Sequence, residues 1–434
     1  MLSKRFAGPY LGTLCLIIQP LLLNVIGIPA TGYIIRQLGA TGYGQWATAT
    51  TLIATVTFLT NLGLRMYFIR SIAQDPDSAQ SGLAEQLGLR VVLGLLATAV
   101  AVSIAVLLRY PTVVIQCTVI AAFGLILTCA ASALTDLLQA TQHLTALAGV
   151  NLIAGLVLTA ASIAVIGARG GPAELSLAYL LGPLVTLALS VRLAQQRCCK
   201  VGVHWNLRRS ASLLWQSRLM ASQLGVGTVA AQAEALLIPK LVGINAYGFF
   251  SAGWLLPSRL GIIPDAVITT FYPIFAQKQR EGTRAAAQEV ARAAVLVLGL
   301  CGAAALGICL IAGPVAKILF PAQATLCRQV MQISVWWLPL QGLAGVMGYA
   351  LNAAGRERDE TRLSILSNIS SIAVSAGLIL TLGLTGAAWA TVCRGSLAVL
   401  VRLPCVLRTF PPVLTQMPLV LRQGLRAAAA AITR

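Results

Sequence analysis

The chain has 434 residues, of which 58% are hydrophobic and only 10% are charged, and its formal net charge is +19. A soluble globular protein carries about 25% charged residues, so this composition excludes a water-soluble domain. The basic residues lie in short loops between apolar runs rather than on a wet basic face, which argues against a nucleic-acid-binding protein. Long apolar runs with short polar connections predict a helical membrane protein.

Apolar runs long enough to cross a bilayer, about 20 residues each, recur along the whole chain. The first is too long for the apolar core of a cleaved signal peptide, roughly 7–15 residues, so we expect it to be retained as a span. The predicted spans are residues 11–35, 45–64, 87–108, 112–137, 148–168, 173–193, 219–243, 248–275, 286–312, 329–351, 362–382 and 386–406. The sequence therefore predicts an all-α polytopic membrane protein with twelve transmembrane helices.

Basic residues divide unevenly between alternate loops. Of the 31 Lys and Arg residues, 23 lie on the side of the N-terminus and two, Arg259 and Arg394, lie within spans. The other six lie at the opposite ends of the spans: Arg36, Arg109, Arg169, Lys240, Lys317 and Arg328. Because cytoplasmic loops carry an excess of Lys and Arg, we expect both termini in the cytoplasm.

Two short sequences repeat about half a chain length apart. LGATGYGQWAT at residues 38–48 is echoed by VGINAYGFFSA at 242–252, and LLQATQH at 137–143 by ALNAAGRER at 350–358. The first pair follows the first span of each six-span half, and the second pair follows the fourth. Because six is an even number, both halves enter the membrane from the same side and should be related by an axis along the membrane normal. This predicts two pseudo-symmetric lobes, residues 1–194 and 219–406, around a central cavity.

The predicted lobes are followed by two polar segments. Residues 195–218 form the largest cytoplasmic segment and are predicted to be the linker between the lobes. Residues 407–434 form a basic cytoplasmic tail, which is either an amphipathic helix on the anionic inner leaflet or a disordered end. Two fused unequal halves favour a transporter, whose substrate site lies between rocking lobes, over a channel.

Several chemistries have no sequence support. The ten cysteines show no CxxC or Cys/His spacing, so we expect neither a disulfide framework nor a metal site. The chain has no P-loop glycine motif, which argues against direct use of ATP. We therefore expect no cofactor.

Charged residues within predicted spans are candidate functional groups, because a charge at mid-bilayer is costly. Arg259 and Arg394 lie at mid-depth, and a guanidinium forms bidentate hydrogen bonds with phosphate. We expect them to face an anionic substrate in the central cavity, with Glu234 and Asp265 as coupling groups or counter-ions. The alternative is that Glu234 pairs with Arg259 and only fixes helix packing. Asp136, near the end of span four, is expected to be solvated.

The motifs LGATGYGQW after span one, NLGL at the end of span two and ALNAAGRERD after span ten resemble those of oligosaccharide flippases. These form the polysaccharide transporter family of the multidrug/oligosaccharidyl-lipid/polysaccharide exporter superfamily. The resemblance covers residues 1–406. Family sequences often carry an acidic residue, commonly Asp, on span seven, and the residue here is Glu234.

The resemblance implies a flippase, not an enzyme, in the bacterial cytoplasmic membrane. It would move undecaprenyl-diphosphate-linked oligosaccharide repeat units, such as those of O-antigen in lipopolysaccharide, from the inner to the outer leaflet by alternating access. Either titration of Glu234 or exchange of a bound cation such as sodium would drive the cycle. Its partners would be membrane lipids, the lipid-linked anionic glycan and polysaccharide assembly proteins.

Two rival functions remain open at this point. A multidrug exporter of the same superfamily would share the fold, but its cavity should be acidic rather than arginine-bearing because such exporters usually carry cationic drugs. A membrane glycan polymerase or ligase would need catalytic groups on a substantial outer loop. The predicted outer loops are short, and His143 and His204 both fall on the inner side.

Overall fold

In a computed structural model of the protein, the described residues are 2–418 apart from 63, 66–67, 69–71, 73–78, 198–201, 203–224, 321–323, 414–415 and 417. This part of the chain is helical and contains no strand. Most of the predicted linker, the start of span seven and most of the tail lie outside it. The helices are α1 (Leu2–Val56), α2 (Phe58–Asn61), α4 (Ala79–Leu107), α5 (Thr112–Ala140), α6 (Leu144–Gly167), α7 (Pro172–Ala178), α8 (Leu181–Arg197), α10 (Ala233–Leu241), α11 (Ile244–Arg259), α12 (Ile262–Glu281), α13 (Thr283–Leu319), α14 (Ala324–Ser334), α15 (Trp337–Ala353) and α16 (Glu357–Thr409).

Nine helical segments of the described chain are long and apolar enough to cross a membrane. Within these segments, α1 is broken at Gly39 and α16 at Gly383, where the backbone is not helical. These glycines lie between the predicted spans one and two and between spans eleven and twelve. The all-α, polytopic fold class is confirmed, and the count of twelve spans stays a prediction.

Large apolar side chains cover the outside of these helices. Leu107 is 83% exposed and Leu310 is 82% exposed. Burying apolar surface is worth about 25 cal/mol per Å², so a surface of this kind would be unfavourable in water. A bilayer removes that cost, and helices satisfy their backbone hydrogen bonds internally within it.

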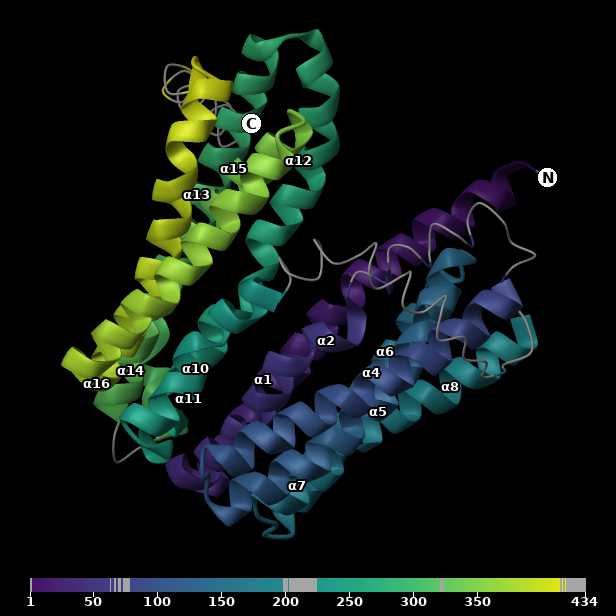
Figure 1. The fold of residues 1–434 in the computed structure, drawn as a ribbon, viewed down its shortest axis with the longest axis vertical. Helices are drawn as coiled ribbons and strands as arrows, with labels where there is room; N and C mark the ends of the chain where they lie inside the picture. Colours follow the sequence, from purple (N-terminus) through teal and green to yellow (C-terminus); the bar gives the residue numbers. More distant parts are fainter. Residues whose placement is uncertain are drawn as a thin grey trace, which may run out of the picture. The chain divides into compact units, whose positions relative to one another are not determined.

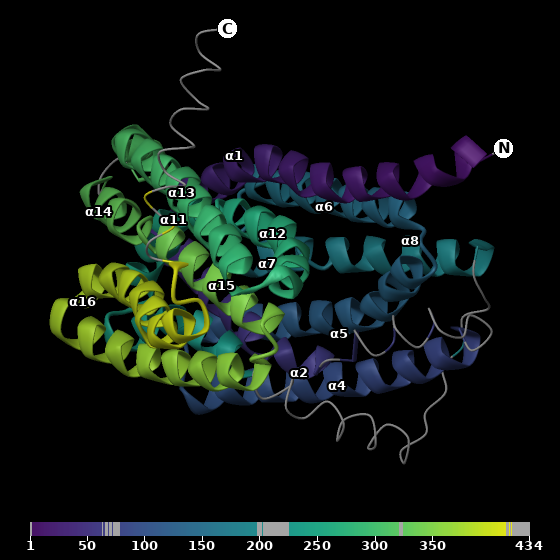
Figure 2. The same ribbon diagram turned by 90° about the horizontal axis from the view of Figure 1, so that it is seen from above.

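The chain divides into two compact units, Met1–Pro239 (unit 1) and Lys240–Arg434 (unit 2). In unit 1, α5 packs against α1, α4 and α8, and α6 packs against α1 and α8 (Figure 1). In unit 2, α13 packs against α12 and α15, and Figure 2 shows α15 beside α16. The division falls within α10, and the lobe limits at residues 194 and 219 stay predictions.

The first sequence repeat produces the same local structure in each unit. Gly39 has φ 66° and ψ 179°, and Gly243 has φ 115° and ψ 158°, a region that essentially only glycine occupies. Each is followed four residues later by a buried tyrosine whose ring contacts an aromatic ring three residues further on. The ring pairs are Tyr43–Trp46, with centroids 5.7 Å apart, and Tyr247–Phe250, with centroids 6.4 Å apart.

The second repeat also has one structure at both places. After α5, the last carbonyls are capped by three backbone N–H groups, and a residue with positive φ, Gln142 (58°), ends the helix. The same three bonds follow α15, where the positive-φ residue is Gly355 (74°). The donors are Thr141, Gln142 and His143 after α5 and Ala354, Gly355 and Arg356 after α15. This is the usual way to satisfy carbonyls at a helix end.

The glycine breaks make a direct stability prediction. Gly39→Ala and Gly243→Ala should each lower the free energy of unfolding by about 1–3 kcal/mol, because alanine is strained at these backbone angles. Gly149→Ala is the matched control, since Gly149 is helical and an added Cβ meets no heavy atom within 4 Å. It should be neutral or stabilising by up to about 1 kcal/mol. Thermal unfolding of the purified protein in detergent measures the difference, and equal losses for all three variants would contradict it.

Candidate functional site

α5 carries a row of polar residues along one face. Thr128, Ser132, Asp136 and Gln139 follow one another at intervals of four or three residues, so they lie on one side of the helix. Asp136 is 4% exposed. Polar residues inside a membrane helix are costly and face a protein interior or a cavity rather than lipid. This face of α5 is therefore the first place to look for function.

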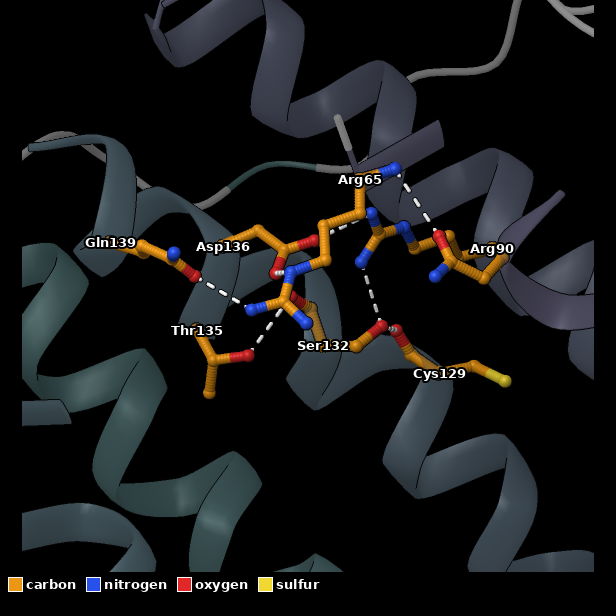
Figure 3. Close-up of polar contacts among 8 residues, drawn as sticks. Arg65, Arg90, Cys129, Ser132, Thr135, Asp136 and Gln139 are labelled. Atoms are coloured by element: carbon orange, nitrogen blue, oxygen red, sulfur yellow. Dashed lines mark hydrogen bonds and ion pairs between the residues drawn. The ribbon is translucent and has the colours of Figure 1, made fainter. Parts of the chain in front are cut away.

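An ion cluster lies at the C-terminal end of this face (Figure 3). Arg90 of α4, which is 2% exposed, donates from Nη2 to Oδ2 of Asp136 at 2.7 Å. Arg65, which follows α2, places its Nε 3.3 Å from Oδ1 of the same carboxylate. One carboxylate thus holds two guanidinium groups that come from different parts of the chain.

Neutral polar groups complete the cluster. Arg90 also donates from Nη1 to Ser132 Oγ at 2.8 Å, and Arg65 donates from Nη2 to Gln139 Oε1 at 2.8 Å. The Nε of Arg90 is buried and has no hydrogen-bond partner among the described residues. The side chain of Arg65 is 51% exposed. Arg90 is therefore a fixed part of the interior, whereas Arg65 remains accessible to a ligand.

A cavity of about 340 Å³ adjoins the cluster and is lined by both arginines, Asp136 and neutral polar side chains. The cavity has an excess of positive charge, because two guanidinium groups and only one carboxylate line it. Two further cavities of unit 1, of about 350 Å³ and 310 Å³, share lining residues with the first. All three include Thr128. Their individual volumes fall within the range of ligand sites, about 300–1,000 Å³.

Unit 2 contains a second buried ion pair. Arg402 donates from Nη2 to Glu360 Oε1 at 2.7 Å and from Nε to both carboxylate oxygens at 3.0 Å. Both residues are 7% exposed, and they lie on the two halves of α16, on either side of Gly383. Arg90 and Asp136 likewise join two consecutive helices. In each unit, a buried ion pair therefore joins the two helices of a helical hairpin at a point far from the turn that connects them.

The residues singled out from the sequence lie elsewhere. Arg259 is exposed at the end of α11 and Asp265 is exposed in the first turn of α12, so they flank the turn at residues 260–261. Arg394 is half-buried on α16, and all three belong to unit 2. Glu234, on α10, belongs to unit 1 and is 2% exposed. Their proposed roles, and the pairing of Glu234 with Arg259, stay predictions.

The expectation that Asp136 is solvated is wrong, because the carboxylate is buried between two arginines. Sequence reasoning also missed Glu360, to which it gave no role, and it counted Arg90 and Arg402 only among the basic residues of the cytoplasmic side. The available signal was the pairing of opposite charges on consecutive spans: Arg90 with Asp136, and Glu360 with Arg402. No group of three or more His, Cys, Asp or Glu side chains that could hold a metal occurs in the described residues.

Comparison with known proteins decides the family. The profile of the polysaccharide biosynthesis protein family matches residues 34–329, which is more than half of the chain. The chain belongs to this family. A second profile, that of the lipid II flippase MurJ, matches residues 265–428. No curated protein sequence matches the chain. These matches confirm the recognition of the chain as a member of a polysaccharide flippase family, whose members are membrane transporters rather than enzymes.

Solved structures show the same fold for this member of the polysaccharide biosynthesis protein family. A lipid II flippase MurJ in an inward closed conformation is similar with a TM-score of 0.71 at 12% identity, over 94% of this chain and 92% of that one. An inward-facing multidrug resistance MATE family transporter of the MOP superfamily gives 0.68 at 15% identity, over 92% and 98%. A MOP superfamily transporter from Pyrococcus furiosus with a binding pocket of reversed polarity gives 0.60 at 14% identity, over 94% and 97%.

Proposed function

We propose that this protein flips an anionic, lipid-linked glycan from the inner to the outer leaflet of the bacterial cytoplasmic membrane for polysaccharide biosynthesis. The observation that carries the proposal is the cation excess at the cavity of unit 1, where Arg65 and Arg90 face the single carboxylate of Asp136. Guanidinium groups suit phosphate because their planar fork matches its oxygens. The substrate class follows from this charge together with the family, and undecaprenyl-diphosphate-linked repeat units such as those of O-antigen fit both.

The multidrug exporter is the alternative that shares this fold. An exporter of cationic drugs would bring a positive ligand to a cavity that already carries excess positive charge. At 4 Å and an effective dielectric constant of about 20, two like charges repel by about 4 kcal/mol. The likeness to MATE transporters is a likeness of fold alone. The charge of this cavity favours an anionic substrate.

Arg259 and Arg394 extend the proposal to unit 2. The first is exposed and the second half-buried, and we assign them to the substrate path as groups that offset the diphosphate charge in a central cavity. Glu234 or Asp265 would couple flipping to protons or to a cation such as sodium. Both termini would lie in the cytoplasm, and membrane lipids and polysaccharide assembly proteins would be the partners.

Substitution of these two arginines tests the proposed function. Arg259→Ala and Arg394→Ala should each abolish most of the transport, and the Lys variants should retain part of it, because charge matters more than side-chain volume along an anion path. The measurement is surface glycan in a strain that lacks the gene, restored by plasmid-borne variants at equal membrane levels.

Arg292→Ala is the matched control, since Arg292 is an exposed arginine of unit 2 that pairs with Glu289 on the same helix. It should restore wild-type surface glycan. Full restoration by both Ala variants would remove these arginines from the substrate path. Failure of the wild-type protein to restore glycan, combined with extrusion of a cationic dye, would overturn the flippase proposal in favour of the exporter.

A further inference from the structure

The three cavities of unit 1 form one tract along the polar face of α5, which we call the α5 tract. Its lining on α5 runs from Ala121, through Thr128, to Gln139. At about 1.5 Å per residue this stretch is about 27 Å long. The ion cluster of Arg65, Arg90 and Asp136 lies at one end. Trp46 and Tyr179 line the other end.

The hydroxyl groups of the tract present hydrogen-bond acceptors. Thr128 Oγ1 donates to Gly124 O at 2.8 Å, Ser132 Oγ to Cys129 O at 2.8 Å, and Thr135 Oγ1 to Ser132 O at 3.0 Å. A hydroxyl has one proton and two lone pairs, so each of these oxygens has used its donor on its own helix and retains acceptor capacity. The middle of the tract therefore suits a ligand with many O–H or N–H donors.

The two ends of the tract supply donors instead. The guanidinium groups of Arg65 and Arg90 lie at the first end, and the buried Nε of Arg90 has no hydrogen-bond partner among the described residues. At the second end, the indole Nε1 of Trp46 is also buried without such a partner in the described part of the chain. The Trp46 ring meets Tyr179 edge-on, with centroids 4.8 Å apart. Buried polar atoms normally have a hydrogen-bond partner in the protein or in ordered water, so the two without one stand out.

This arrangement of hydrogen-bond donors and acceptors along the tract fits a phosphorylated sugar. A phosphate is rich in acceptors and fits the arginine end, whereas sugar hydroxyls donate to the acceptor row of α5 and accept from Trp46. A cationic amine would also donate to the row, but the excess positive charge at the arginine end opposes it. A purely apolar ligand would leave the tract's polar groups unpaired, which is costly.

We propose that the α5 tract is a glycan-binding subsite within unit 1, with the phosphate of the substrate at the accessible Arg65 of the ion cluster and its saccharide along Thr128, Ser132 and Thr135. The inference rests on the proposed flippase function and adds where the sugar is recognised. Discrimination between glycans would then depend on the tract wall, and retention of the lipid phosphate on the arginine end.

Two lipid probes separate sugar recognition from phosphate recognition. Undecaprenyl diphosphate carries the anion alone, and the glycan-bearing lipid is extracted from a strain that lacks the gene. Binding of each to the full-length protein in nanodiscs is measured for the wild type, for the double variant Thr128→Val/Thr135→Val, and for Trp46→Phe. Thr118→Val is the matched control, because Thr118 is buried on the same helix, donates to Val114 O, and lines none of the three cavities.

The double variant should bind the glycan-bearing lipid at least about tenfold more weakly and undecaprenyl diphosphate as the wild type does, since each lost acceptor leaves a sugar donor unsatisfied. Trp46→Phe should show the same selective loss of severalfold, which keeps the test valid if the double variant unfolds. Arg65→Gln should weaken both lipids, and Thr118→Val neither.

Wild-type affinity for the glycan-bearing lipid in both tract variants would overturn the subsite and leave the flippase proposal standing. Equal losses for both lipids would also overturn it, because the tract would then be structural or filled by water alone. If the wild type binds neither lipid, both the subsite and the proposed function fail.

Discussion

Asp136→Ala should lower the free energy of unfolding by about 3–5 kcal/mol, because it leaves the buried guanidinium of Arg90 without its carboxylate. Arg90 is 2% exposed, and its only charged partner among the described contacts is Asp136, at 2.7 Å. Ser132 would remain as a neutral acceptor at 2.8 Å, which offsets little of a charge held in a low-dielectric interior. Unfolding of the purified protein in detergent measures the loss.

The same cluster provides its own control. Arg65→Ala should cost less than about 1 kcal/mol, because the Arg65 side chain is 51% exposed and exposed ion pairs contribute little. The double variant Arg90→Met/Asp136→Leu should recover most of the stability, since a buried pair can be replaced by apolar residues at little cost. If Asp136→Ala and Arg65→Ala are equally mild, Arg90 is solvated in the membrane and the cluster is not a buried ion pair.

The sequence supports much of the fold because hydrophobicity and glycine act locally. Apolar runs indicate the helices, and the breaks at Gly39 and Gly383 fall between predicted spans. The repeat around Gly39 and Gly243 could be recognised in the letters because each glycine is required by its own backbone angles. None of this depends on what another helix contributes.

The candidate site depends on packing between helices, and the sequence-based expectation for Asp136 was wrong for this reason. Asp136 was expected to be solvated because it lies near a helix end, and depth along one helix was the only available measure. Its burial results from Arg90 on α4 and Arg65 beyond α2, which cover both carboxylate oxygens. Position in the chain does not reveal such partners. The acceptor row of α5, formed by the hydroxyl groups of Thr128, Ser132 and Thr135, was overlooked for a related reason. Thr and Ser carry no charge, and they donate their hydroxyl protons to carbonyls of their own helix.

Arg65 and Arg90 differ in a way that bears on transport. The buried Arg90 is held by Asp136 and Ser132, so it fixes α4 to α5 in any state that keeps these contacts. Arg65 contacts the same carboxylate at a longer distance, 3.3 Å, and is half exposed. A phosphate that approaches the cavity can therefore recruit Arg65 at a smaller cost than Arg90. The carboxylate of Asp136 thus binds one structural cation, Arg90, and one accessible cation, Arg65.

Glu360→Ala should destabilise unit 2 by about 3–5 kcal/mol for the same physical reason, with Arg402 as the stranded charge. Arg402 makes three of its hydrogen bonds to Glu360 and a further one, at 3.0 Å, to the carbonyl of Ala398. Space around the pair is also limited, since a Cβ on Gly348 would lie 2.9 Å from Glu360 Oε1. Gly348→Ala should therefore displace the carboxylate and reproduce part of the loss.

Asp359→Ala is the matched control, one residue away on the same helix. Asp359 pairs with Arg356 at 2.7 Å, but both side chains are 38% exposed, so water replaces the lost partner and the transition temperature should not change measurably. Glu360→Gln should lie between the two, because glutamine still accepts from Arg402 but no longer neutralises it. Equal effects of Glu360→Ala and Asp359→Ala would show that burial does not decide the strength of these pairs. A large loss confined to Glu360→Ala and Gly348→Ala would show that the hairpin of α16 depends on the pair that joins its two halves.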